Sequence, residues 1–302
     1  MATITEIGTN SAYLEYTSSD GFVGVMDILE IYLTNASKGY VFMDSLSDDN
    51  NYVFKNVDDA GRPYCIKFRF DTSNNNRIYT ELYEYDETNN QLINKTYRSN
   101  ERVAQPIDLN AGGYFYIFAH PKWFVWYGSS PARQGDWNWG SWTGVFVRER
   151  AVGEDATNIN YNYPAVAFTS GGHLRGSDGN YRFWGCPRLY YSAAVKTGEN
   201  ASKWSYWSNG LKLVNRNNNN FFDGDPDWFT GQYYAADIIV GYNYQKFGRL
   251  YGLKEINSNL GNLMDIVKLK VDANYFLDDT ATTETDFFII PGGSPLRFAI
   301  PK

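Results

Sequence analysis

The sequence has very few of the residues on which most catalytic and metal sites depend. Its 302 residues include only two histidines and two cysteines. A Ser-His-Asp triad or a zinc site would need these rare residues to meet a specific set of partners. The nucleophile elbow Gly-x-Ser-x-Gly and the phosphate-binding loop GxxxxGK[ST] are also missing. We therefore expect a protein that is not an enzyme and that uses no cofactor.

The few cysteines and histidines have simple structural interpretations. Cys65 and Cys186 form neither a CxxC pair nor a disulfide framework, so we expect both to be small buried residues. His120 and His173 stand in loop-like stretches, where we expect each to make a hydrogen bond.

The chain also lacks basic runs and long apolar runs. Asp and Glu (34) outnumber Lys and Arg (27), and the net charge is -7 at pH 7. Because affinity for phosphates needs clustered basic residues, we expect no nucleic-acid binding. No stretch reaches the roughly 18 apolar residues of a membrane-spanning helix, and the first residues do not resemble a signal peptide. These features predict a protein that is made in a cytoplasm and enters no membrane.

Aromatic residues and glycines are abundant instead. Aromatic residues make up 18% of the chain, with 25 Tyr, 19 Phe and 9 Trp, and there are 27 Gly. This composition favours sheets and tight turns over long helices. We expect a mainly β protein of antiparallel aromatic- and Gly-rich sheets, sandwich or barrel-like, with a short N-terminal helical element. Residues 1–302 should form one structural unit, with a possible soft boundary near 105–112.

Two stretches show helical periodicity. In residues 21–42 the apolar residues fall on one helical face, and residues 35–39 would end the helix; this face comprises Val25, Ile28, Leu29, Tyr32 and Leu33. The second stretch, residues 259–270, is short and can equally lead into a strand.

Alternating apolar and polar residues predict strands through most of the remaining chain. Residues 64–70 and 78–85 read as a hairpin across a polar turn. Residues 112–128 form two aromatic runs that break at His120-Pro121, because proline cannot donate to a strand ladder. Further strands are predicted within 143–150, 163–172, 181–191 and 234–243, and on both sides of the turn at 291–293.

Tryptophans supply the first set of candidate site residues. The segment WNWGSW, residues 137–142, should form a turn between two strands, and WSYWSNG begins at residue 204. Exposed rings can stack on sugars, whereas buried rings provide large contact areas at cores and interfaces. We favour packing or subunit contact over glycan stacking for the candidates Trp137, Trp139, Trp142, Trp204 and Trp207.

An acidic turn supplies the second set. Asp223, Asp225 and Asp227 alternate in FFDGDPDW, and calcium prefers several oxygen ligands from a flexible turn. An EF-hand loop would need Gly at 228 and Glu at 234, where the chain has Trp228 and Tyr234. We therefore favour a solvated turn and keep a metal site as the alternative.

The order of several segments resembles virion structural proteins of tailed bacteriophages. These segments are YFYIFAHPKWFVWYG, WTGVFVRER, YPAVAFTSGG, FGRLYGLKEI and PGGSPLRFAIPK. The resemblance extends over roughly residues 21–300 and implies a role in the virion, with other virion proteins as partners. It identifies no functional residue.

These observations leave three hypotheses. The first is a non-enzymatic tail-side virion protein, from the tail tip, baseplate or neck, present in many copies as a homo-oligomer; a capsid decoration protein is a variant of it. The second is a module that binds host-surface glycan through the Trp-rich loops. The third is a polysaccharide hydrolase that uses carboxylates such as Asp223, Asp225 or Asp227.

Overall fold

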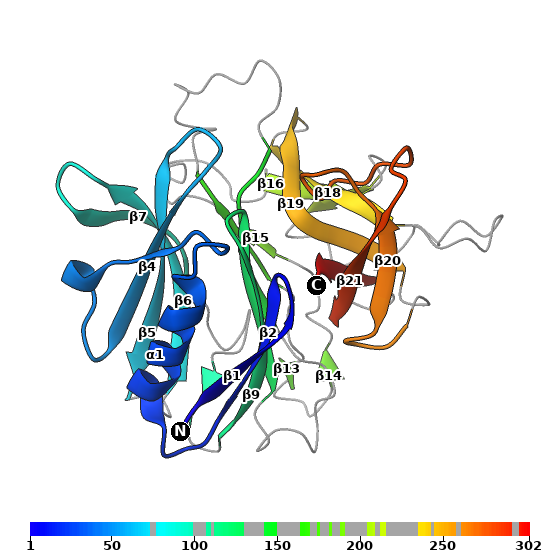
Figure 1. Cartoon of the computed structure of the whole chain (residues 1–302). Coiled ribbons are helices and arrows are strands. Elements are labelled where there is room, and N and C mark those ends of the chain that lie inside the picture. The colour runs from blue at the N-terminus through cyan, green and yellow to red at the C-terminus, as the bar shows by residue number, and fades with distance from the viewer. Residues whose placement is uncertain are drawn as a thin grey trace.

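The protein consists mainly of antiparallel sheets, as the sequence predicts (Figure 1). A computed structural model of the chain describes residues 1–72, 77–98, 107–109, 112–129, 142–149, 164–169, 174–175, 181–182, 188–190, 204–208, 212–215, 235–242, 245–257, 261–291 and 296–302. Within these ranges there are three large sheets, a two-stranded sheet, one α-helix and one short 3-10 helix.

The central sheet has seven strands in the order β1-β2-β9-β10-β11-β12-β15, each antiparallel to its neighbours. Its strands are β1 (Thr3–Gly8), β2 (Ser11–Tyr16), β9 (Gly113–His120), β10 (Trp123–Ser129), β11 (Trp142–Phe146), β12 (Val166–Thr169) and β15 (Arg188–Tyr190). The hairpin β9–β10 contains the predicted break at His120-Pro121, which confirms the two aromatic runs as paired strands.

The N-terminal sheet has the strand order β3-β4-β5-β6-β7, and β8 also pairs with β6. Its strands are β3 (Val41–Phe42), β4 (Asn51–Val57), β5 (Pro63–Asp71), β6 (Arg77–Asp86), β7 (Gln91–Arg98) and β8 (Ile107–Asp108), with the 3-10 helix η1 (Asp44–Leu46) beside β4. The pairing of β5 with β6 confirms the predicted hairpin. Cys65 of β5 is buried as expected, and burial raises the pKa of its thiol to about 12.

The C-terminal sheet has the order β17-β16-β18-β19-β22-β21-β20. Its strands are β16 (Trp204–Ser208), β17 (Lys212–Asn215), β18 (Ala235–Tyr242), β19 (Gln245–Asn257), β20 (Ile266–Lys270), β21 (Glu284–Pro291) and β22 (Leu296–Pro301). The two-stranded sheet consists of β13 (Leu174–Arg175) and β14 (Tyr181–Arg182). The last two strands pair as the sequence predicts.

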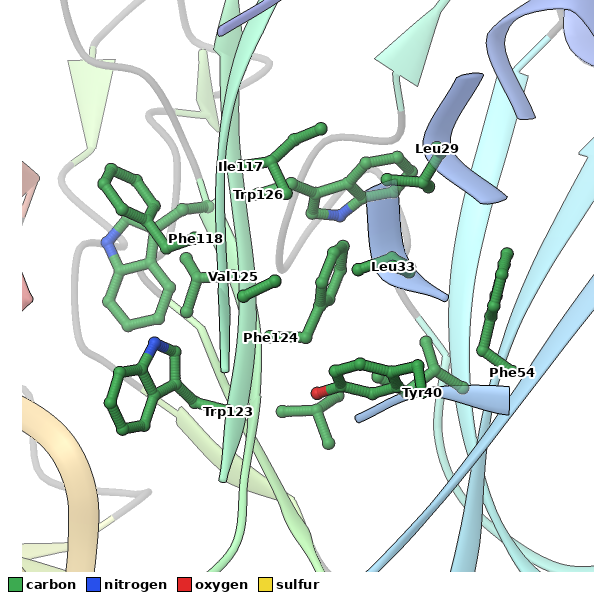
Figure 2. Packing of buried hydrophobic residues seen from close by; sticks show 14 of the residues in the cluster. Leu29, Leu33, Tyr40, Phe54, Ile117, Phe118, Trp123, Phe124, Val125 and Trp126 are labelled. Carbon is green, nitrogen blue, oxygen red and sulfur yellow. The ribbon is translucent and has the colours of Figure 1, made fainter. Parts of the chain in front are cut away.

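The predicted N-terminal helix is α1 (Gly21–Leu33), and it ends just before the expected stop at 35–39. Its buried face comprises Phe22, Val25, Met26, Leu29, Tyr32 and Leu33. Phe22 stacks on Phe70 of the N-terminal sheet with ring centroids 5.1 Å apart. Leu29 and Leu33 point toward Trp126 and Phe124 of the central sheet (Figure 2). The helix thus fills the space between two sheets.

For the second helical candidate, the helix is wrong, and the alternative that the stretch leads into a strand holds. Residues 261–265 form turns and bends, and the chain then enters the edge strand β20. Met264 has φ +67°, which a helix does not tolerate, and its N–H donates to the carbonyl of Ile289 at 2.7 Å. Pairing with β21 therefore overrides the short helical pattern.

The three large sheets form successive layers, with the central sheet in the middle (Figure 1). Because side chains alternate along a strand, β10 directs Phe124 and Trp126 toward the N-terminal sheet and Trp123 toward the C-terminal sheet (Figure 2). One hydrophobic core extends through both interfaces. The chain passes from the N-terminal sheet at β8 to the central sheet at Gly113, close to the soft boundary proposed near 105–112.

Candidate functional site

Most of the predicted site residues lie outside the described part of the chain. Trp137 and Trp139 belong to residues 130–141, which join β10 to β11, and Asp223, Asp225 and Asp227 lie between β17 and β18. For Trp204 and Trp207 the structure describes the backbone, which forms β16. The interface, glycan and metal roles of these residues stay predictions.

Trp142 is the exception, and it is a packing residue. Its side chain is fully buried. The indole packs edge-on against Phe298 of β22 with ring centroids 5.6 Å apart, and against Phe146 at 6.4 Å. This ring therefore joins the central sheet to the C-terminal sheet inside one chain.

A set of tyrosines occupies the same face of the central sheet as Trp142, and we call it the tyrosine face. Cross-strand pairing aligns one residue from each of five strands in a first row, which is Thr5, Tyr13, Tyr116, Tyr127 and Trp142. A second row of Thr3, Glu15, Tyr114 and Ser129 runs beside it. Burial increases along the first row from exposed Thr5, through three half-buried tyrosines, to buried Trp142.

The four tyrosine rings of this face contact one another. The ring of Tyr13 lies 5.3 Å from that of Tyr114 and 5.4 Å from that of Tyr116, measured between centroids. Tyr116 and Tyr127 are stacked at 6.0 Å with an interplanar angle of 18°. Such spacing is typical of favourable aromatic pairs. The four rings therefore form a continuous aromatic surface.

Burial affects the pKa of three phenols on the tyrosine face. Burial raises the pKa of Tyr13 and Tyr116, and it raises the pKa of Tyr127 to about 12. Glu15 provides the one carboxylate in the two rows. At the buried end, Arg297 lies near Tyr127, and burial lowers the pKa of its guanidinium. The face thus offers hydroxyl donors and aromatic rings with little net charge.

A second cluster joins all three sheets, and we call it the three-sheet junction. Asp59 comes from the β4–β5 turn, Lys122 from the β9–β10 turn and Tyr251 from β19. The carboxylate of Asp59 pairs with the ammonium of Lys122 and accepts a hydrogen bond from the Tyr251 hydroxyl. The ammonium also lies 5.4 Å from the centre of the Tyr251 ring. These contacts connect the three layers through side chains.

Next to this junction, Arg249 is the centre of an ion network. Its guanidinium contacts Glu149 at 2.8 Å and Asp237 at 3.2 Å, and it lies 3.7 Å from the centre of the Phe276 ring. Asp237 also pairs with the fully buried ammonium of Lys254 at 2.8 Å. Burial lowers the pKa of Lys254, while Asp237 opposes that shift. Because these charges are paired with one another, we assign the network a structural role.

His120 lies between these features at the end of β9. Its Nδ1 accepts a hydrogen bond from the backbone N–H of Lys122 at 3.2 Å, which agrees with the role expected of it. The imidazole stacks on Trp123 at 4.1 Å. Burial, together with the charges of Lys122 and Lys38, lowers its pKa to about 4. His120 is therefore neutral at pH 7.

A cavity of about 310 Å³ lies where β22 meets the β1–β2 turn. Its polar groups already contact one another. The side-chain amide of Asn10 donates to the Tyr275 hydroxyl at 3.3 Å, and the ammonium of Lys302 lies 4.0 Å from Asp286. We therefore regard this cavity as a packing feature of the layer interface.

Two strand edges differ in how they are protected. Among the described strands, β1 pairs only with β2, and β20 pairs only with β21. β20 has exposed Lys268 and Lys270, a common protection against unwanted strand pairing. β1, with the sequence TITEIG, contains neither lysine nor proline and has a single charged residue, Glu6. Its edge is therefore the better template for an added strand.

Comparisons with known proteins add no family to this description. No protein-family model matches the chain, and no curated protein matches its sequence significantly. Within the described ranges, no group of three His, Cys, Asp or Glu side chains is placed to hold a metal ion. The described part of the chain also contains no helix long and apolar enough to cross a membrane.

The sequence reasoning missed the tyrosine face because it concentrated on the rarer tryptophans. A signal was present in GYFYIF, where Tyr114 and Tyr116 alternate with Phe115 and Ile117. Alternation of phenol-bearing and fully apolar residues indicates a strand with one wetter face. The pattern does not reveal that Tyr13 and Tyr127 lie beside these residues on neighbouring strands.

Proposed function

We propose that the chain is a non-enzymatic structural protein of a tailed bacteriophage virion, a multi-copy tail-side component that acts by self-association and docking onto other virion proteins. The observation that carries this proposal is the edge strand β1, which contains neither lysine nor proline. The resemblance over residues 21–300 gives the proposal its viral context.

Strand pairing at β1 provides the physical route to self-association. An edge strand presents backbone N–H and C=O groups on its outer side, and another chain can pair with them. Lys268 and Lys270 disfavour such pairing at β20, whereas the sequence of β1 contains no lysine. A neighbouring copy that adds its own strand there would extend the seven-stranded central sheet. Closed symmetry would then limit assembly to a defined number of copies.

The test is the mass of the purified chain in solution, measured by light scattering at several concentrations. We expect a discrete multiple of 34.5 kDa that forms as the concentration rises. The double variant Thr3→Lys/Thr5→Lys places two positive charges on β1 and should shift the mass toward the monomer. The matched control Lys268→Arg keeps the charge on β20 and should leave the mass unchanged.

Two results would contradict the proposal. One is a chain that stays monomeric at every concentration and binds no other component of a purified particle. The other is an oligomer whose mass the β1 variant does not change, because assembly would then use a different surface.

A further inference from the structure

We propose that the tyrosine face binds a neutral carbohydrate chain. It is defined by Tyr13, Tyr114, Tyr116 and Tyr127 with the neighbouring Thr3, Thr5 and Glu15. These residues are not among the tryptophan candidates, and the proposal does not depend on self-association.

The geometry of the face suits an extended ligand. The first row places three tyrosines on three adjacent strands, and adjacent strands lie about 4.8 Å apart. Tyr13, Tyr116 and Tyr127 therefore span about 10 Å across the sheet. Exposed Thr3, Thr5 and Glu15 continue the surface to the strand edge. An extended ligand can therefore lie across the strands and continue beyond the edge strand β1.

The chemistry of the face fits sugars in two ways. Sugar rings present apolar C–H faces, which pack on aromatic rings, and hydroxyl groups, which need polar partners. Each of the four tyrosines carries a phenol hydroxyl, which can donate to or accept from a ligand hydroxyl. Burial raises the pKa of Tyr13, Tyr116 and Tyr127 above the ordinary phenol value, so these hydroxyls are protonated donors at neutral pH. Glu15 supplies an acceptor.

Charge selects neutral ligands over polyanions. The two rows contain no Lys or Arg, and Glu15 would repel phosphate or sulfate groups. Arg297 is half-buried at the inner end near Tyr127, away from the exposed residues at the edge. Binding of nucleic acid or sulfated polymers depends on clustered basic residues, which this face lacks.

Tyrosines of the N-terminal sheet provide a contrast. The rings of Tyr79, Tyr83 and Tyr85 each lie beneath a cation of their own chain, at 4.8, 5.3 and 5.6 Å from the ring centre. Those cations belong to Arg69, Lys95 and Lys55. Because intramolecular cations already occupy these rings, the N-terminal sheet is not the carbohydrate site.

The experiment is affinity electrophoresis of the full chain in gels that contain dextran, hydroxyethyl cellulose or mannan, with heparin as the polyanionic probe. We expect at least one neutral polymer to retard the chain, while heparin does not. The double variant Tyr13→Ala/Tyr114→Ala should weaken that retardation at least tenfold. Tyr85→Ala, which removes a strand tyrosine of the N-terminal sheet, should bind as the parent does.

Thermal unfolding of each variant shows that it is folded before its binding is compared. The proposal is overturned if no neutral polymer retards the parent chain, if only heparin does, or if the folded double variant binds with unchanged affinity. Tyr116→Phe extends the test, because it keeps the ring and removes the hydroxyl. We expect a smaller loss of affinity than for the double variant.

Discussion

The two faces of the central sheet are made by the same strands but have different chemistry. Ile117 of β9 is buried on the face that packs against α1 and the N-terminal sheet (Figure 2). Phe115 is buried on the same face, with its ring 5.5 Å from that of Trp126. Their chain neighbours Tyr114 and Tyr116 lie on the opposite face and remain half-buried. Neighbouring residues of one strand thus meet different surroundings.

The two faces differ because the layer that packs on the second face covers only one end of it. The C-terminal sheet covers one end of the second face, where Phe118 contacts Phe288 and Trp142 contacts Phe298. From the covered end of the first row to its exposed end, the side chains change from tryptophan to tyrosine and then to threonine. On the central sheet, the fully buried end of this row is a tryptophan, and the half-buried positions nearer water are tyrosines, whose rings carry a hydroxyl group.

The largest expected effect is on the fully covered face. Trp126 is 5% exposed, and its ring lies 4.8 Å from that of Phe68. Trp126→Ala should lower the free energy of unfolding by about 3 to 5 kcal/mol, measured by urea denaturation. The control on the other face, Tyr13→Ala, should cost less than about 1 kcal/mol. Equal losses of unfolding free energy in the two variants would show that the two faces contribute equally to stability.

The next effect concerns the backbone of β19 where it covers Trp123. Gly252 has φ +74°, and a Cβ there would lie 2.8 Å from the Trp123 ring. Gly252→Ala should therefore cost about 3 kcal/mol, from backbone strain and overpacking together. Gly61 has the same φ but no atom near its Cβ position, so Gly61→Ala should cost only about 1 kcal/mol. Similar thermal midpoints for the two variants would show that contact with Trp123 contributes nothing.

A smaller effect should appear as a dependence on pH at the covered end of the second face. The folded-state pKa of His120 is about 4, below its ordinary value of 6.5, so the unfolded chain binds a proton first. The free energy of unfolding should therefore fall as the pH drops from about 6.5 toward 4. His120→Phe retains a ring on Trp123 but does not titrate, so its stability should fall less over that range. If the urea midpoints of the parent chain and of His120→Phe fall by the same amount from pH 7 to pH 4, the prediction is contradicted.

The smallest effect is expected at the exposed end of the tyrosine face. Tyr114→Thr keeps a residue suited to strands and should change the free energy of unfolding by less than about 1 kcal/mol. The same replacement one residue later, Phe115→Thr, removes a buried ring and should cost at least about 3 kcal/mol. Urea denaturation of both variants checks the contrast. A Tyr114→Thr loss as large as that of Phe115→Thr would mean that the tyrosine is part of the core.

Local patterns predicted much of the fold. The spacing of Val25, Leu29 and Leu33 predicted α1, and alternation on each side of a turn predicted the hairpins β5–β6 and β9–β10. These elements depend on contacts between residues that are close in sequence. For residues 259–270 the local pattern left a helix and a strand open, and pairing of β20 with β21 decided in favour of the strand.

The layers and the tyrosine face could not be predicted, because local sequence patterns do not show which strands pair. Tyr13 and Tyr116 become neighbours only through the pairing of β2 with β9, and a local pattern does not encode that partner choice. Trp142 belongs to the same row yet is buried, because β22 packs over it. The exposure of an aromatic residue therefore depends on where a distant sheet ends.

The three-sheet junction also sets an order of events during folding. The Tyr251 hydroxyl and the Asp59 carboxylate that it contacts are 192 positions apart in the chain. Closing so long a loop costs conformational entropy before any contact compensates for it, whereas the hairpins β4–β5 and β9–β10 close over short turns. We therefore expect the hairpins that supply Asp59 and Lys122 to form early, and Tyr251 to reach Asp59 only when β19 docks. This hydrogen bond can form only after the C-terminal sheet has packed against the other two layers.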